Sequence, residues 1–332
     1  MKNILPLCDP PLKYNQIETN VFSIVLADEA VWDWLYNNLI HIAFSKTGKW
    51  GVFLSNEDSW LHSPFLYYQT FSRAFIGLQY DQFIQFVIRA IDMENYFFLN
   101  IDTFYIPNYD STEHRGHCIF LFGYDTDNNT FHIADFFSGK YDRQECSFEE
   151  FYKAYIHFSL SENQVFDNVV LLSRRRGHIY DKSYALNPQM IKKSLIDYLD
   201  AKYPYNKYKE FEMPQMAERY YGIAIYNILI SLANDYKDTR DRINPMLFAL
   251  NYEHKRIMRK RVEYMQGKGL IKYTAAMHDN LILMEKGLLA CRNMVLKYNA
   301  TSDTKILQQV QAYYDDLQVL DIDVCNNLIH II

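Results

Sequence analysis

Residues 114–135 read HRGHCIFLFGYDTDNNTFHIAD, and the pattern of this stretch predicts a β-hairpin. Cys118–Tyr124 and Thr130–Ala134 are apolar runs rich in aromatic and branched residues, and the polar residues between them are typical of a reversing loop. His117 opens the first run and Asp135 closes the second. In an antiparallel pair joined by a short loop these two ends lie side by side, so we expect His117 and Asp135 to meet.

A carboxylate next to an imidazole orients the ring, fixes its tautomer and stabilises its cationic form. His117 and Asp135 are therefore predicted to be the base and the orienting acid of a triad whose nucleophile comes from elsewhere in the chain. A lone histidine at a strand end is more often a surface residue, and a lone aspartate there more often belongs to a turn. The functional interpretation therefore depends on the pairing of the two residues.

Short motifs in and around the hairpin carry a resemblance to known families. They are GH at 116–117, GYD at 123–125, FHIAD at 131–135, DTFYIP at 102–107 and SGKY at 138–141. The hairpin motifs resemble the histidine and aspartate strands of papain-like cysteine peptidases of the bacteriocin-processing type. With the flanking motifs, the chain more closely resembles the butirosin-biosynthesis-H-like acyltransferases of nonribosomal peptide and polyketide pathways. The resemblance covers residues 1–175 and, more faintly, the helical remainder.

The resemblance implies an α+β fold, with a papain-like cysteine-protease-type domain built on an antiparallel sheet and an all-helical C-terminal domain. It also implies an acyltransferase that moves an acyl group from a carrier-protein thioester to a small amine, forming an amide bond in natural-product (antibiotic) biosynthesis. The expected partners are the acyl or peptidyl carrier protein and the amine acceptor. The acyl donor would be carried on the phosphopantetheine arm of the carrier, so we expect no cofactor bound by this chain.

The nucleophile is the part of the site that the sequence leaves open. In the resembling acyltransferases the nucleophilic cysteine stands at the start of the first helix, yet the first helical pattern here, about Thr19–Leu26, contains no cysteine. The only cysteine before the hairpin is Cys8, in an extended or turning segment rich in proline. The predicted catalytic residues are therefore Cys8, His117 and Asp135. Another nucleophile, or a degenerate site, is the alternative.

Two other functions remain open for the same residues. With water in place of the amine, the chain would be a cysteine peptidase or thioesterase. Without a nucleophile, it would be a noncatalytic binding or scaffold protein on a papain-like fold. The sequence has no Walker loop, no GxGxxG after a strand and no GxSxG motif, which disfavours nucleotide-dependent chemistry. His114 and His117 lack accompanying metal-ligand motifs, so no metal is predicted.

Composition excludes several classes of partner. The formal net charge of −6 disfavours general binding to nucleic acid. No apolar run approaches the roughly 18 residues that span a membrane. The five cysteines show no regular spacing and no apolar leader follows Met1, so we expect a cytoplasmic protein.

The patterns along the chain predict two domains. Residues 1–175 combine helices with strands and would form the papain-like acyltransferase domain, 176–188 would be a linker, and 189–332 would be the helical domain. The expected helices include Glu29–Ala43, Tyr80–Met93, Ser147–His157, Met190–Tyr203, Ala217–Tyr236, Asn244–Met265, Thr274–Tyr298 and Thr301–Val319.

Two basic segments bear on the expected carrier partner. Residues 174–178 read RRRGH, and residues 253–261 read EHKRIMRKR. The ordinary interpretation of both is a solvated surface. The alternative is that they dock an acidic carrier protein and its phosphate.

Overall fold

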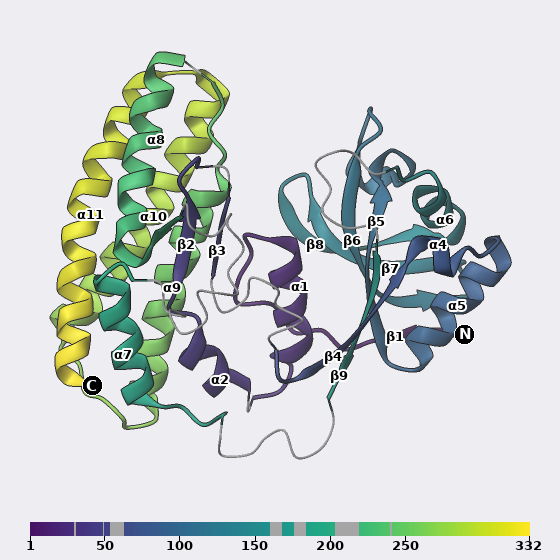
Figure 1. Cartoon of the computed structure of the whole chain (residues 1–332), viewed down its shortest axis with the longest axis horizontal. Helices are drawn as coiled ribbons and strands as arrows, with labels where there is room; N and C mark the ends of the chain where they lie inside the picture. Colours follow the sequence, from purple (N-terminus) through teal and green to yellow (C-terminus); the bar gives the residue numbers. More distant parts are fainter. Residues whose placement is uncertain are drawn as a thin grey trace, which may run out of the picture. The chain divides into compact units, whose positions relative to one another are not determined.

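The computed structural model describes residues 1–29, 31–48, 50–53, 63–159, 168–175, 184–202, 219–239 and 241–332. The chain divides into two compact units (Figure 1). The first unit comprises Met1–Glu29 and Asp58–Tyr180, and the second comprises Ala30–Glu57 and Asp181–Ile332. We expected residues 1–175 to form one domain, but residues 30–57 of this range belong to the second unit. Most of the expected linker, residues 176–183, lies outside the described residues.

The first unit contains a seven-stranded sheet in the order β4-β9-β5-β6-β7-β8, with β1 paired to β6. All of these pairs are antiparallel. The strands are β1 (Lys2–Ile4), β4 (Leu66–Ser72), β5 (Asn95–Asp102), β6 (Gly116–Asp125), β7 (Thr130–Phe137), β8 (Lys140–Ser147) and β9 (Asn168–Arg174). The hairpin expected from the sequence is formed by β6 and β7, neither of which is an edge strand of the sheet.

Among the described residues, the helices of the first unit are α1 (Gln16–Val25), α4 (Arg73–Ile76), α5 (Tyr80–Asp92) and α6 (Phe148–Ile156), with 3-10 turns η2 (Thr103–Tyr105) and η3 (Pro107–Tyr109). Asn15 caps α1 by accepting a hydrogen bond from the Ile17 amide. A capping box begins α6, because Ser147 and Glu150 exchange side-chain and backbone hydrogen bonds. Phe83 of α5 stacks on α6, which joins these two helices.

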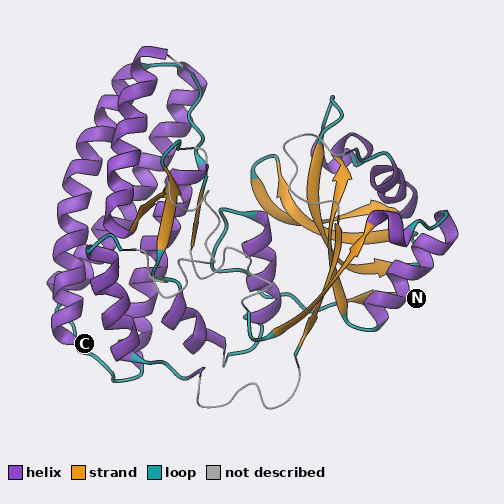
Figure 2. Ribbon diagram, viewed as in Figure 1, coloured by secondary structure: helices purple, strands orange, loops and turns teal. Residues whose placement is uncertain are grey.

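The second unit is mainly helical (Figure 2). The helices described in this unit are α2 (Val31–Asn38), α7 (Pro188–Leu199), α8 (Ile225–Thr239), α9 (Met246–Gly267), α10 (Ala275–Thr301) and α11 (Thr304–Ile331), with the 3-10 turn η8 (Gly222–Ala224). The chain is therefore α+β, with an antiparallel sheet and a helical C-terminal region. None of the helices described is both long and apolar enough to cross a membrane.

The prediction of an all-helical second domain is wrong in one respect. A three-stranded antiparallel sheet in the order β10-β2-β3 belongs to this unit, made of β2 (Ile42–Ser45), β3 (Gly51–Phe53) and β10 (Arg219–Tyr221). Helix α2 stops at Asn38, before the end expected from the sequence, and α8 starts after β10. The apolar residues of the run at 39–44 are buried, and pairing with β3 and β10 decides the conformation of residues 42–44.

The basic segment 253–261 on α9 is not simply a solvated surface. His254, Lys255 and Arg261 are buried. Lys255 forms an ion pair with Asp321 of α11 at 2.6 Å, and both side chains are fully buried. His254 and Arg261 donate to backbone carbonyls at the end of α2 and in the turn that follows it. These three polar side chains therefore hold the interior of the second unit together, because each has a specific partner.

Candidate active site

The structure brings His117 and Asp135 together. The paired register of β6 and β7 runs from Asp125 opposite Thr130 to Phe120 opposite Ala134, and His117 and Asp135 lie just past its end. His117 Nε2 is 2.8 Å from Asp135 Oδ2. The His117 side chain is 36 % exposed, whereas the Asp135 side chain is 0 % exposed. A buried carboxylate thus holds an imidazole that reaches solvent.

This hydrogen bond sets the role of the second ring nitrogen of His117. Asp135 accepts a hydrogen bond from Nε2–H, so in the neutral ring Nδ1 carries the lone pair and can accept a proton. Within the described part of the chain, no hydrogen bond engages Nδ1. Asp135 is fixed from its other oxygen, because the Phe136 amide donates to Oδ1 at 2.7 Å. The arrangement is that of a general base with its orienting carboxylate.

A third side chain, Tyr109, contacts both members of this pair, and the sequence did not identify it. The Tyr109 hydroxyl donates a hydrogen bond to the same Asp135 Oδ2 that accepts from His117. The Tyr109 ring meets the His117 ring edge to face, with centroids 5.6 Å apart. Burial, together with the negative charge of Asp135, raises the pKa of Tyr109 well above its ordinary value. Tyr109 therefore stays protonated and acts as a donor.

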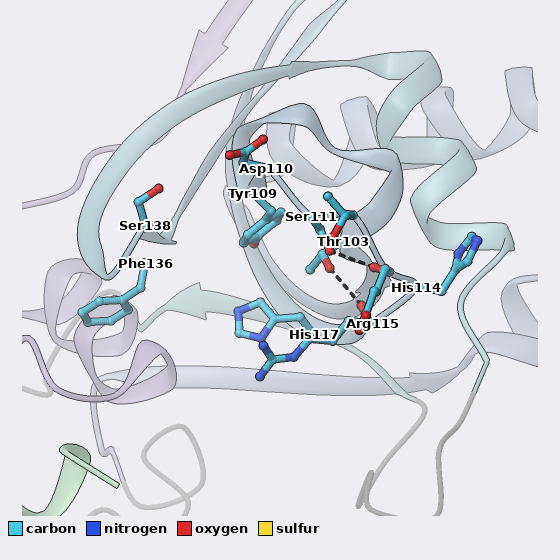
Figure 3. A pocket seen from close by; sticks show the side chains of 11 residues that line it. Thr103, Tyr109, Asp110, Ser111, His114, Arg115, His117, Phe136 and Ser138 are labelled. Atoms are coloured by element: carbon cyan, nitrogen blue, oxygen red, sulfur yellow. Dashed lines mark hydrogen bonds between the residues drawn. The ribbon is translucent and has the colours of Figure 1, made fainter. Parts of the chain in front are cut away.

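His117 and Tyr109 line a pocket of about 600 Å³ (Figure 3). Its walls also comprise Thr103, the rest of the loop 110–115, Phe136 and Ser138. In Figure 3 His117 lies between Phe136 and Ser138 at one end and His114 at the other. A pocket of this size beside the His117 imidazole has room for a molecule of small-molecule dimensions.

A second histidine and carboxylate pair belongs to the wall of the same pocket. His114 Nδ1 is 2.7 Å from Asp102 Oδ2, and the His114 side chain is 62 % exposed. The other oxygen of Asp102 accepts hydrogen bonds from the backbone amides of Phe104 and Arg115, each at 3.1 Å. Asp102 thus ties the beginning of the pocket loop to its end, and His114 is part of this connection.

The third predicted site residue, Cys8, has no contact with His117 or Asp135 in the part of the chain that the structure describes. Its thiol donates to the Phe22 carbonyl at 3.6 Å, and its own carbonyl accepts from Arg143 at 2.6 Å. Cys8 is half-buried, and burial raises the pKa of its thiol although Arg143 acts in the opposite direction. These surroundings disfavour the thiolate that a nucleophile requires.

The start of α1 lies beside the strand of His117. The Gln16 side chain donates to the Cys118 carbonyl, and the Asn20 side chain donates to the Ala134 carbonyl at 3.5 Å. Phe22, which binds the Cys8 thiol, follows Gln16 by six residues, or roughly 9 Å along the helix axis. The helix end next to His117 therefore carries an amide side chain, and Cys8 contacts the opposite end of α1.

The remaining cysteines do not supply an activated thiol either. Burial, with a contribution from the charge of Asp135, raises the pKa of Cys118. Cys146, Cys291 and Cys325 are buried, and burial raises their pKa values as well. Across the described ranges, no three His, Cys, Asp or Glu side chains are grouped as metal ligands would be.

Comparison with known proteins adds no family to this geometry, since neither a protein-family model nor a curated protein matches the chain.

Proposed function

We propose that this chain is an amide-forming acyltransferase in which His117 is the general base for an amine that attacks a thioester directly. The observation that carries the proposal is the hydrogen bond between His117 Nε2 and the buried Asp135, which leaves Nδ1 as the free nitrogen of a pocket-lining ring. The acyl donor would be a carrier-protein thioester, and the acceptor a small amine. The first unit would be a papain-like domain, and the reaction would take place in the cytoplasm.

The reaction needs no activation beyond the thioester itself. The amine nitrogen attacks the thioester carbon and forms the C–N bond, while His117 Nδ1 takes the proton that the nitrogen gives up. The C–S bond then breaks, the electron pair leaves with sulfur, and the proton passes from His117 to the thiolate or to water. The buried charge of Asp135 stabilises the imidazolium between these two steps.

Direct attack fits the position of the cysteines better than a covalent acyl-enzyme. The Cys8 thiol is engaged by the Phe22 carbonyl, and burial disfavours its thiolate. A covalent route through Cys8 would require the thiol to leave this carbonyl and reach His117. General-base catalysis by a histidine contributes about 10²–10⁴-fold without a nucleophilic side chain.

The test is intact-protein mass spectrometry with an acyl-loaded carrier protein and a panel of primary amines. We expect the carrier to lose its acyl mass, the amide to form, and no acyl mass to appear on the chain. His117→Ala should slow transfer at least about a hundredfold, whereas Cys8→Ser should retain it. His157→Ala serves as the matched control, because His157 stacks on Tyr105 and lies outside the pocket wall.

Each other outcome selects a different function. An acyl mass on the wild type that Cys8→Ser abolishes would establish a covalent route through Cys8. Release of the free acid without amide would indicate a thioesterase or, with peptide substrates, a peptidase. If the carrier keeps its acyl mass with the wild type and with every amine, the proposal of an enzyme fails. A noncatalytic binding protein then becomes the better hypothesis.

A further inference from the structure

We infer that Tyr109 is a positioning residue for the His117–Asp135 pair, holding the carboxylate through its hydroxyl and the imidazole through its ring. Two independent contacts carry this inference. The hydroxyl donates to Asp135 Oδ2, and the ring packs edge to face on His117 at an interplanar angle of 78°. One side chain thus touches both members of the pair, and each contact restricts a different torsion.

The loop that carries Tyr109 is built to fix this side chain. Tyr109 ends the turn η3, and the next residue, Asp110, adopts a left-handed backbone with φ of 49°. Aspartate tolerates this conformation better than most residues. The Asp110 amide donates to the Pro107 carbonyl at 2.9 Å, which closes the turn, and the Tyr109 ring also packs against Phe137 at 5.0 Å between centroids.

The hydroxyl has an electrostatic effect as well as a geometric one. Because Tyr109 and His117 share Asp135 Oδ2, the hydroxyl takes up part of the negative charge that would otherwise stabilise the imidazolium. Without the hydroxyl, that part of the charge would act on the imidazole instead. Removing the hydroxyl should keep His117 protonated up to higher pH.

The charges of the other titratable groups near the pair must be the same in the wild type and the variants. They are Cys118, Cys146, Tyr141 and Asp142 on the sheet, and Asp110, Glu113, His114 and Arg115 on the loop. Tyr109→Phe changes none of them. Burial also raises the pKa values of both thiols and of Tyr141, so these three groups remain neutral in the range of the experiment.

The experiment compares wild type, Tyr109→Phe and Tyr105→Phe. NMR titration of the His117 ring should show its midpoint at higher pH in Tyr109→Phe, by about one pH unit, and unchanged in Tyr105→Phe. The kinetic part of the test rests on the proposed function. In Tyr109→Phe, the acidic limb of the pH profile of kcat/KM should move to higher pH by the same amount. At a pH above the acidic limbs of both the wild type and Tyr109→Phe, kcat of the variant should be about tenfold lower than that of the wild type, because the positioning of the pair is lost.

The two proposals fail in different ways. An unchanged His117 midpoint in folded Tyr109→Phe overturns the inference, whether or not the protein is an acyltransferase. A shifted midpoint in a protein without transfer activity retains the inference and removes the proposed function. Wild-type ¹⁵N shifts give a check without any variant, because a proton on Nδ1 of neutral His117 would contradict the geometry on which the role of Tyr109 depends.

Discussion

In the proposed mechanism, the negative charge of Asp135 makes His117 a base rather than a merely oriented ring. Asp135→Asn keeps the size of the side chain, but its amide nitrogen would oppose the proton on His117 Nε2. The ring would then favour the other tautomer, with the proton on Nδ1. We expect transfer to fall by about 10²–10⁴-fold in a folded protein, measured as kcat/KM with a loaded carrier. An unchanged pH–rate profile in this variant would remove Asp135 from the mechanism.

The residues of the site differ in how far the sequence could predict them. His117 and Asp135 come from one hairpin, so strand alternation and a short loop are enough to bring them close. Tyr109 precedes that hairpin in an irregular loop, and no periodicity indicates where its hydroxyl lies. The position of Cys8 depends on which turn of α1 it contacts, which is a tertiary property.

At the level of elements, the ordered conformation of the loop between β5 and β6 should depend on Asp102. This carboxylate accepts from His114 at one oxygen and from the amides of Phe104 and Arg115 at the other, so it joins both ends of the loop. Asp102→Asn loses the charge that strengthens all three bonds. We expect amide hydrogen exchange across residues 103–115 to rise at least about tenfold, with little change in β7 and β8.

The control for this loop is Glu113→Gln, which removes a charge from the exposed part of the same segment. It should leave the exchange rates of residues 103–115 as they are in the wild type. Equal effects in Glu113→Gln and Asp102→Asn would mean that net charge, rather than the hydrogen bonds of Asp102, orders the loop.

Elements defined by local signals were predictable, and those defined by distant partners were not. The helix α6 begins where its capping box indicates, because Ser147 and Glu150 satisfy backbone amides within one turn. The run at 39–44 gives no such local signal. It forms β2 because strands β3 and β10 pair with it, and β10 comes from a segment more than a hundred residues later in the chain.

At the scale of the whole molecule, the buried pair Lys255–Asp321 should be essential to the second unit. Lys255 also donates to the Tyr198 hydroxyl at 2.8 Å, and Tyr198 donates to Asp321 at 2.7 Å. Lys255→Met leaves the Asp321 charge buried without its counterion, which costs about 3–5 kcal/mol of unfolding free energy. The double variant Lys255→Met/Asp321→Leu should lose less than Lys255→Met alone, measured by urea unfolding.

A surface pair supplies the comparison for the buried one. Lys153 and Glu149 form an exposed ion pair on α6, and Lys153→Met should leave the unfolding free energy nearly unchanged. If Lys255→Met is as mild as Lys153→Met, then Lys255 is not charged in the folded protein and the buried network does not need its ion pair.

The second unit should also lose stability on mild acidification, because desolvation lowers the pKa values of two of its histidines. Burial lowers the pKa of His254 well below its ordinary value and lowers that of His41 to about 4. Below about pH 6.5 the unfolded chain binds protons that the folded chain does not, so the unfolding free energy falls by about 1.4 kcal/mol per pH unit for each histidine. The contribution of His41 levels off near pH 4, where its folded form is protonated as well.

Tryptophan fluorescence can follow this unit, because Trp32, Trp34 and Trp50 belong to it and Trp60 can be changed to Phe. Urea unfolding between pH 7 and pH 4.5 should give a falling free energy in the Trp60→Phe background. Adding His254→Gln and His41→Gln should flatten that dependence. In the first unit, burial raises the pKa of Glu18 well above its ordinary value, so acidification stabilises that unit through Glu18. A probe in the second unit is therefore needed to isolate the effect of the histidines. A pH dependence that persists without both histidines would assign the acid sensitivity to other groups.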